Sequence, residues 1–322
     1  MTMEMSSDKR PLLVPLDGSI PAGQPLEVAQ AIAELREDEI HVLFVTPRPL
    51  SPRQIAGKVG IPEEWRPRIT LLNAVGEPAE AICRVAHDID ADAILMSTHG
   101  RTGDLQSVAG HVTLDVLRDP PCPIYVVRSA LNAASQAQRL RCLRRILVPL
   151  DGTFEAVVSV GEASVLAQRA NARLIMLHVV DDRPETARAP ASPLYMDHPS
   201  YELEAWRDEF IRSSFAVHER PPAAPTDVVL RAGDPVREIT RYAAESDADL
   251  VVASWNGTLS RGRAKVVQRL LERATCPLLF LVGKRQGLSV AARPTPQGEW
   301  ESAGGDEEPD DSHGQRTAAG GY

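Results

Sequence analysis

The sequence predicts an α/β protein made of two doubly wound parallel sheets in tandem, with five strands in each sheet. Three observations lead to this fold class. Four blocks of sequence occur twice in the same order, short apolar runs alternate with helical patterns, and the apolar runs are nearly continuous. Strands that alternate with helices form a parallel sheet covered on both faces, and such strands are apolar along their whole length. Right-handed crossovers then favour winding in two directions from the first strand.

Four pairs of matching segments carry the repeat. They are KRPLLVPLDGS at 9–19 with RRILVPLDGT at 144–153, GEPAEAICRVA at 76–86 with GDPVREITRYA at 233–243, DADAILMSTHG at 90–100 with DADLVVASWNG at 247–257, and CPIYVV at 122–127 with CPLLFLV at 276–282. The offset between the copies is 134 residues for the first pair, 157 for the next two and 154 for the last. The second copy therefore gains 23 residues, within the segment 181–225, and later loses three. Both changes fall where loops are expected, and loops tolerate changes of length.

Each copy is predicted to contain five strands. They are LLVPL (12–16), IHVLFV (40–45), RITLLN (68–73), AILM (93–96) and IYVV (124–127) in the first copy, and ILVPL (146–150), ARLIMLHVV (172–180), TDVVLR (226–231), LVVA (250–253) and LLFLV (278–282) in the second. The two last strands, Ile124–Val127 and Leu278–Val282, are expected to pair with each other, because such pairing covers exposed sheet edges.

Helices are predicted between the strands from apolar residues that recur at helical spacing. These residues are Val28, Ile32 and Leu35, then Ile82, Val85, Ala86 and Ile89, then Val112, Val116 and Leu117, and in the second copy Ile239, Tyr242 and Ala243, then Val266, Leu270 and Leu271.

The chain divides into five parts on this reading. They are an N-terminal extension (1–9), a first domain (10–130), a linker (131–143), a second domain (144–285) and an acidic tail (286–322). The tail holds seven acidic and two basic residues and is rich in Gly, Pro and Ser, so we expect it to be disordered. Within the longer second copy, Leu203, Trp206 and Phe210 share one helical face. That spacing is typical of a packing helix, and an aromatic surface that stacks on a ligand stays open as the alternative.

Composition narrows the classes of function. The chain has 322 residues, of which 43% are hydrophobic and 25% charged, and its net charge is −9. An acidic chain without a basic run is a poor candidate for binding nucleic acid. No apolar run reaches the roughly 18–20 residues that cross a bilayer, and the first ten residues lack the apolar core of a signal peptide. We therefore expect a cytoplasmic protein that binds no membrane.

The four cysteines predict neither a disulfide framework nor a metal site. Cys83, Cys122, Cys142 and Cys276 form no CxxC pair and have no histidine pair at zinc-ligand spacing. We therefore expect them to be small buried apolar side chains, not zinc ligands.

The loop at 97–113 is the most informative segment for function. It leaves an apolar strand, contains three glycines and enters a helix near Gly110. Glycines let a backbone approach a ligand closely, and a helix start presents free N–H groups that favour a phosphate. Arg101 adds a positive charge, and the Thr113 hydroxyl adds a donor. A glycine-rich connection that binds no ligand is the alternative.

With its neighbouring blocks, this loop resembles the nucleotide loop of universal stress proteins, a Gly-x₂-Gly-x₉-Gly-Ser/Thr pattern after the fourth strand. The first strand ending in VPLDGS, the GEPAEAI helix entry and the CPIYVV last strand also fit that family. The resemblance covers residues 10–128 and again 144–283. It implies a Rossmann-like fold of the adenine nucleotide alpha hydrolase-like type, in a family with ATP-binding and non-binding branches.

The resemblance implies a set of nucleotide-binding residues. Asp17 matches the family's aspartate near the adenine, and Val45 matches the backbone position beside the base. Gly100 and Gly110, with nine residues between them, match the second and third glycines of the loop. The complete set expected to bind ATP in the first domain is Asp17, Val45, Gly100, Arg101, Gly110, His111, Val112 and Thr113.

Two positions depart from the family pattern. Ser97 stands where the first glycine is expected, and His111 stands where Ser or Thr is expected. Serine is small, whereas His111 either donates to a phosphate or is only an exposed residue at the start of a helix. ATP binding and a site without a ligand therefore both stay open.

The second copy departs further. Its loop is three residues shorter, with Ser254 for the first glycine, Gly257 retained, Ala264 for the third glycine and Lys265 at the Ser/Thr position. We expect this site to be degenerate. The glycines at 257 and 262 resemble a P-loop only superficially, because the Lys and Ser/Thr that hold phosphate and magnesium are missing.

We therefore expect a stress-response regulatory protein that is not an enzyme, that binds ATP in its first domain and that presents a surface to an unidentified protein partner. A scaffold of the same fold that works without a nucleotide is the second hypothesis, and a weak ATP hydrolase is the third. Asp17 and Asp151 have no paired base nearby in sequence, so turn-forming or ligand-binding aspartates are the better interpretation. Pairing with a second copy of the chain is left open.

Overall fold

A computed structural model describes residues 10–18, 23–98, 111–129, 131–151, 154–180, 224–255 and 263–282 of the protein. The predictions for the N-terminal extension, for the acidic tail and for the helix with Leu203, Trp206 and Phe210 lie outside these residues. Within them, no helix combines the length and the apolar character that crossing a bilayer requires.

All ten predicted strands are found in the part of the chain that the structure describes. The first repeat contains β1 (Pro11–Pro15), β2 (Glu39–Thr46), β3 (Ile69–Val75), β4 (Ala93–Ser97) and β5 (Ile124–Val127). Its helices are α1 (Gly23–Arg36), α2 (Pro52–Val59), the 3₁₀ helix η1 (Glu63–Arg68), α3 (Pro78–Asp88) and α4 (His111–Arg118). After α5 (Ala133–Arg141), the second repeat contains β6 (Arg145–Leu150), β7 (Arg173–Val180), β8 (Thr226–Ala232), β9 (Leu250–Trp255) and β10 (Leu278–Val282), with α6 (Phe154–Ala170), α8 (Pro235–Glu245) and α9 (Arg263–Arg273).

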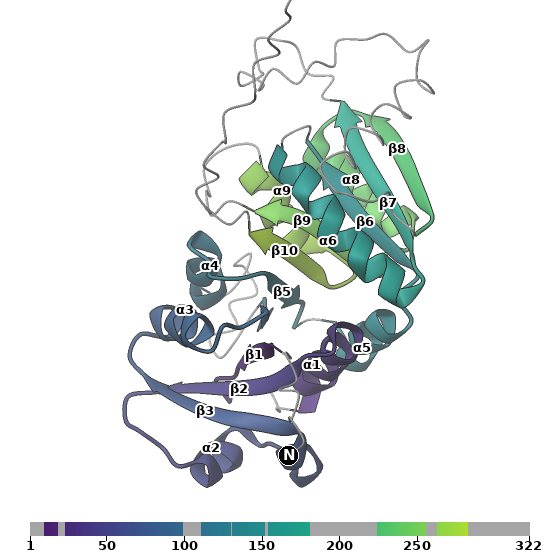
Figure 1. The fold of residues 1–322 in the computed structure, drawn as a ribbon. Coiled ribbons are helices and arrows are strands. Elements are labelled where there is room, and N and C mark those ends of the chain that lie inside the picture. Colours follow the sequence, from purple (N-terminus) through teal and green to yellow (C-terminus); the bar gives the residue numbers. More distant parts are fainter. Residues whose placement is uncertain are drawn as a thin grey trace, which may run out of the picture. The chain divides into compact units, whose positions relative to one another are not determined.

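The strands join into one ten-stranded sheet (Figure 1), in the order β3-β2-β1-β4-β5-β10-β9-β6-β7-β8. Pairing is parallel within each repeat and antiparallel between β5 and β10, where Leu279 lies opposite Tyr125. The predicted pairing of the two last strands is therefore confirmed, and it fuses the two expected five-stranded sheets into a single one. In the first repeat the winding reverses between β1 and β4, which pair directly.

Helices cover both faces of this sheet, and this explains why the strands are apolar throughout. Successive side chains of a strand point to opposite faces. Leu12 and Val14 thus pack in a core with α1, α5 and α6, whereas Leu13 packs in a second core with α3, α4, α8 and α9. Val28 and Ile32 of α1, predicted as one face, are buried in the first of these cores.

The segment expected as a linker contains a packed helix. Asn132 caps α5, its side chain accepting from the Ser135 N–H at 3.1 Å. Gln136 is 3% exposed and both donates to the Arg128 carbonyl and accepts from the Arg128 N–H, each at 3.1 Å. Arg141 forms an ion pair with Glu34 of α1. The connection between the repeats is therefore held against the first repeat.

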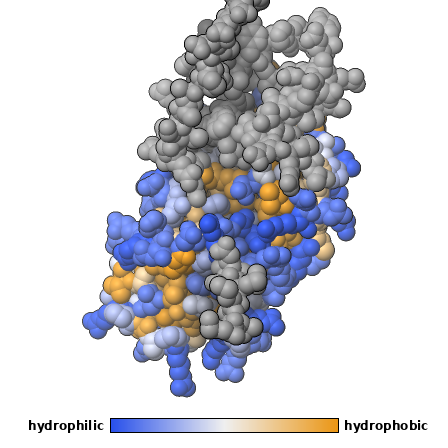
Figure 2. All heavy atoms as spheres, in the orientation of Figure 1, coloured by the Kyte–Doolittle hydropathy of each residue, from blue (hydrophilic) through white to orange (hydrophobic). Residues whose placement is uncertain are grey.

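The edges of the sheet are β3 and β8, because β5 and β10 lie at its centre. Most residues of both edge strands are half-buried. Figure 2 shows a mainly hydrophilic surface on the described part of the chain, with hydrophobic residues visible over β2 and β3.

Candidate functional site

Asp17, Val45 and the start of α4, which belong to the predicted site of the first repeat, lie where the strands end at the reversal of winding. β1 pairs with β2 on one side and with β4 on the other. Asp17 follows β1, Val45 lies near the end of β2, and Ser97 ends β4. In open α/β sheets, ligands bind beyond the carboxyl ends of the strands at this point.

A glycine turn fixes the position of Asp17. The Leu16 N–H still donates to the Leu43 carbonyl at 2.9 Å, so the β1–β2 ladder extends to the residue before Asp17. Gly18 then takes a φ of 74°, and a Cβ placed there would lie 3.1 Å from the Lys58 carbonyl oxygen. The chain turns at once at this point because Gly18 has no side chain. The exposed Asp17 is thereby held at the rim of the sheet.

Asn73 of β3 organises the end of β2. Its Nδ2 donates to the Phe44 carbonyl at 2.8 Å and to Thr46 Oγ1 at 3.0 Å, and its Oδ1 accepts from the Leu50 N–H at 2.7 Å. The half-buried Val45 lies between Phe44 and Thr46, so these bonds fix its backbone. Asn73 was not anticipated from the sequence, although a single amide at the end of the apolar run RITLLN was a signal for it.

Two threonines anchor the end of β4. The Thr98 N–H donates to the Val127 carbonyl at 2.8 Å, and Thr98 Oγ1 accepts from the Ser129 N–H at 3.3 Å. Thr113 of α4 is 4% exposed, and its hydroxyl donates to the Ser97 carbonyl at 2.9 Å. The hydroxyl that was expected to donate to a phosphate thus donates its hydrogen bond to the strand, because Thr113 lies on the face of α4 that packs on β4.

The other predicted residues lie at or beyond the start of α4. His111 is exposed as the first residue of the helix, and Val112 is half-buried. Gly100, Arg101 and Gly110 lie outside the described residues. The structure therefore places Asp17, Val45 and the start of α4 at one end of neighbouring strands, and it does not describe the loop that would complete the site.

The corresponding edge of the second repeat is built from different side chains. Asp151 is exposed at the end of β6, as Asp17 is at the end of β1. His178 occupies the position of Phe44, and its Nδ1 lies 3.0 Å from the Leu150 carbonyl oxygen. Burial lowers the pKa of His178, while that hydrogen bond and the nearby Asp151 raise it by less. A neutral imidazole with its Nδ1 turned to the backbone adds no positive charge for a phosphate at neutral pH.

The Thr98 position of the second repeat is filled by Trp255. Its side chain is fully buried, and its indole Nε1 donates to the Leu117 carbonyl of α4. The end of β9 is thereby joined to the first repeat. Lys265, at the Ser/Thr position of the family pattern, is exposed on α9.

A half-buried charged cluster lies at the opposite ends of the strands. Arg36 contacts both Asp38, just before β2, and Asp92, just before β4. Burial raises the pKa of Asp38 to about 6, with Arg36 opposing the shift and Asp92 adding to it. Because these groups lie at the amino ends of the strands, they are separate from the candidate site.

The cysteine thiols divide into two kinds. Cys122 and Cys276 are buried, as expected, and burial raises the pKa of each to about 12. Cys83 is half-buried and Cys142 is exposed at the end of α5, so the expectation of a buried side chain was wrong for Cys142. The first two thiols therefore stay protonated, and they are not available as nucleophiles.

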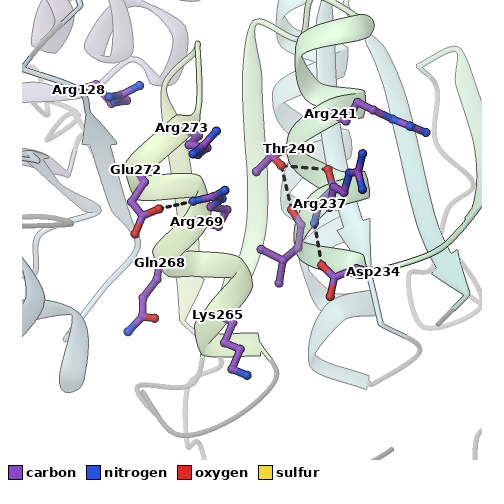
Figure 3. A pocket seen from close by; sticks show the side chains of 11 residues that line it. Arg128, Asp234, Arg237, Thr240, Arg241, Lys265, Gln268, Arg269, Glu272 and Arg273 are labelled. Carbon is purple, nitrogen blue, oxygen red and sulfur yellow. Dashed lines mark hydrogen bonds and ion pairs between the residues drawn. The ribbon is translucent and has the colours of Figure 1, made fainter. Parts of the chain in front are cut away.

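A groove between α8 and α9 was not anticipated from the sequence (Figure 3). It encloses about 880 Å³ and is lined by six basic and two acidic side chains. The sequence signal was a difference in charge between matching helices of the two repeats, which becomes visible only when the copies are aligned.

Comparison with known proteins identifies the family of the sequence and solved structures with a similar fold. The sequence model of the universal stress protein family matches residues 9–128 and 143–281. A universal stress protein of Methanocaldococcus jannaschii is 36% identical over 66 residues, which are 20% of this chain and 39% of that protein. The chain thus spans well under half of the length of that relative.

Two solved structures resemble nearly the whole described fold. They are a universal stress protein from Archaeoglobus fulgidus, with a TM-score of 0.59, and a protein from Pseudomonas aeruginosa titled a putative universal stress protein, with a TM-score of 0.58. Each is 18% identical to this chain and covers 85% of it, and the matches span 99% and 94% of the two structures. At this identity the likeness bears on the fold alone.

Proposed function

Since the chain belongs to the universal stress protein family, we propose that it is a regulatory binding protein whose first domain binds ATP. In this proposal the second-domain site is degenerate, and the nucleotide biases a surface that a protein partner recognises. A cytoplasmic location is part of the same proposal.

One observation carries the ATP proposal. Asp17, Val45 and the start of α4 lie at the ends of adjacent strands, at the reversal of winding between β1 and β4. From the match to the family pattern, we expect the adenine and the phosphates to bind at these positions. The exposed His111 is the first residue of α4, and the free backbone N–H groups of a helix start favour a phosphate.

The differences between the two edges support a degenerate second site. His178 replaces Phe44 and uses its Nδ1 on the Leu150 carbonyl, and Trp255 replaces Thr98 and is buried against α4. Lys265 stands at the position of His111. None of these second-repeat side chains offers the Ser/Thr hydroxyl of the family pattern.

Two matched substitutions test the assignment. Asp17→Asn and Asp151→Asn change equivalent exposed aspartates at the ends of β1 and β6. Titration of the purified wild-type chain with ATP by calorimetry should show heat of binding. Asp17→Asn should reduce this heat, and Asp151→Asn should leave it unchanged. Gly110→Val should also abolish it, because a branched side chain would block the backbone approach.

The alternatives give different results in the same experiment. No heat at millimolar ATP in the wild-type chain favours a scaffold of the same fold that works without a nucleotide. Heat lost only in Asp151→Asn would move the site to the second domain. Slow phosphate release that is lost in Gly110→Val would favour a weak hydrolase over pure binding.

The central strand pair limits how a second copy of the chain can bind. β5 and β10 already pair with each other, so neither offers a free edge to another molecule. A homodimer would have to use another surface, such as the edge strands β3 and β8. The comparison of elution volumes at low and high protein concentration tests for such a dimer.

A further inference from the structure

The groove between α8 and α9 has a mainly basic lining. Six basic side chains line it, from Arg128 after β5, from α8 and from α9, and only two acidic ones accompany them. The lining is therefore strongly basic, in a chain whose net charge is −9. Three of the basic residues, Arg237, Lys265 and Arg273, are exposed and form no ion pair with any residue that the structure describes.

The other basic side chains of the groove are already engaged. Arg269 pairs with Glu272 on the same helix at 2.9 Å, and Arg241 pairs with Glu238 at 2.6 Å. The guanidinium of Arg128 donates to the Ala274 carbonyl at 3.2 Å. The ion pairs leave the positive charge of the lining on Arg237, Lys265 and Arg273, and on Arg128, whose carbonyl partner is neutral.

The first repeat provides an internal comparison for these charges. α3 and α4 pack against each other there, as α8 and α9 do here. At the offsets of 157 and 154 residues, Arg237 matches Glu80, Arg273 matches Asp119 and Lys265 matches His111. The fold is therefore compatible with acidic side chains at two of these positions, so the basic residues are not needed to form the helix pair.

The ion pair between Arg269 and Glu272, unlike the three unpaired basic residues, has an ion pair as its counterpart in the first repeat. Arg269 and Glu272 match Asp115 and Arg118, which form an ion pair of reversed order at 2.5 Å. That exchange leaves the charge of the helix unchanged. The gain in positive charge thus comes from the three unpaired residues, which favours a binding role over a structural one.

We propose that the groove between α8 and α9 binds a short acidic segment of a partner polypeptide. Lys265 and Arg273 are eight residues apart on α9, about 12 Å along the helix, which matches about four residues of an extended peptide. Arginine forks bind carboxylates in bidentate geometry. Gln268 adds a hydrogen-bonding group, and Val236 adds an apolar contact.

The lining favours a peptide over a nucleic acid. None of the described lining residues is aromatic, so the groove offers no surface on which bases stack. The net charge of the chain also repels a long polyanion, whereas a short acidic segment meets mainly the local charge. The proposal does not depend on ATP binding in the first domain.

Binding of a fluorescein-labelled decaglutamate peptide to the full chain tests this proposal. Fluorescence anisotropy at low salt should show saturable binding that weakens as salt is added. The variant Arg237→Glu/Arg273→Asp carries the residues of the first repeat and should bind about tenfold more weakly, because two attractive charges are replaced by two that repel the peptide. Lys265→His should weaken binding by a smaller factor.

The control is Arg53→Glu/Arg68→Asp, which makes the same change of net charge at two exposed positions of the first repeat. It should retain the wild-type affinity to within about twofold. Circular dichroism establishes whether each variant is folded. If the double variant Arg237→Glu/Arg273→Asp does not fold, the single variant Lys265→His replaces it in the binding test. Absence of saturable binding, or equal loss in both double variants, would overturn the proposal. So would tighter binding of a single-stranded oligonucleotide or of polyphosphate with the same sensitivity to Arg237 and Arg273.

Discussion

The indole Nε1 of Trp255 donates a hydrogen bond to the carbonyl oxygen of Leu117. Trp255 ends β9 in the second repeat, and Leu117 lies in the last turn of α4 in the first. The last carbonyls of a helix have no partner within it, so this bond satisfies one of them. It holds the two repeats together at a point away from the β5–β10 pairing.

Replacement of Trp255 should destabilise the protein more than its size alone predicts. Trp255→Phe keeps most of the buried ring but leaves the Leu117 carbonyl without its donor, which should cost about 1–3 kcal/mol. Trp255→Ala should cost about 3–5 kcal/mol. Trp65→Phe, at a half-buried position in η1, is the control and should cost less than about 1 kcal/mol. Urea unfolding measures all three, and equal losses for the two Phe variants would contradict this role.

Thr113 is expected to act on stability more than on ligand binding. Thr113→Val keeps the shape of the side chain but removes the hydroxyl that donates to the Ser97 carbonyl, which should lower the free energy of unfolding by about 0.5–1.5 kcal/mol. Thr240→Val is the control, because that half-buried hydroxyl bonds carbonyls of its own helix and should cost less. Thermal unfolding and ATP calorimetry should be run together. A large loss of ATP affinity with unchanged stability would show that the hydroxyl turns to the phosphate instead.

Asp38 should make a pH-dependent contribution to stability. Burial raises its pKa from an ordinary value of 3.8 to about 6, so the folded state holds the proton more tightly than the unfolded state. The contribution of the protonated group is complete below about pH 4 and is lost as the pH rises through about 6. The stability of wild type relative to Asp38→Asn should therefore fall from about pH 4 through about pH 6 and level off above it. Urea unfolding at several pH values measures this difference, and a rise over the same range would mean that Arg36 outweighs burial.

The strands and most helices could be predicted because their signals are local. Each strand is an apolar run, and Val28, Ile32 and the matching residues of the other helices recur at helical spacing. The pairing of β5 with β10 was expected from the family resemblance, and it covers two strand edges. α5 gave no such signal, because its sequence AASQAQRLR is mostly polar and only Ala137 and Leu140 are buried apolar residues.

Only some residues of the candidate site could be named from the sequence. Asp17 and Val45 were named because they match a family pattern, and their role stays a prediction. The hydrogen bonds of Asn73 and Thr113 depend on backbone groups that only the folded sheet brings near. The partner of Trp255 is 138 residues away, and the charge of the α8–α9 groove comes from two separate helices and a residue after β5.

The direct pairing of β5 with β10 has a consequence for how the two halves can differ. Two separate molecules joined through the same strands would come apart on dilution, and every substitution would occur twice, at symmetry-related positions. Here the halves are covalently joined, so their association does not depend on protein concentration. A change such as Trp for Thr, or Arg for Glu, therefore alters one half alone, and the two halves are free to take on separate tasks.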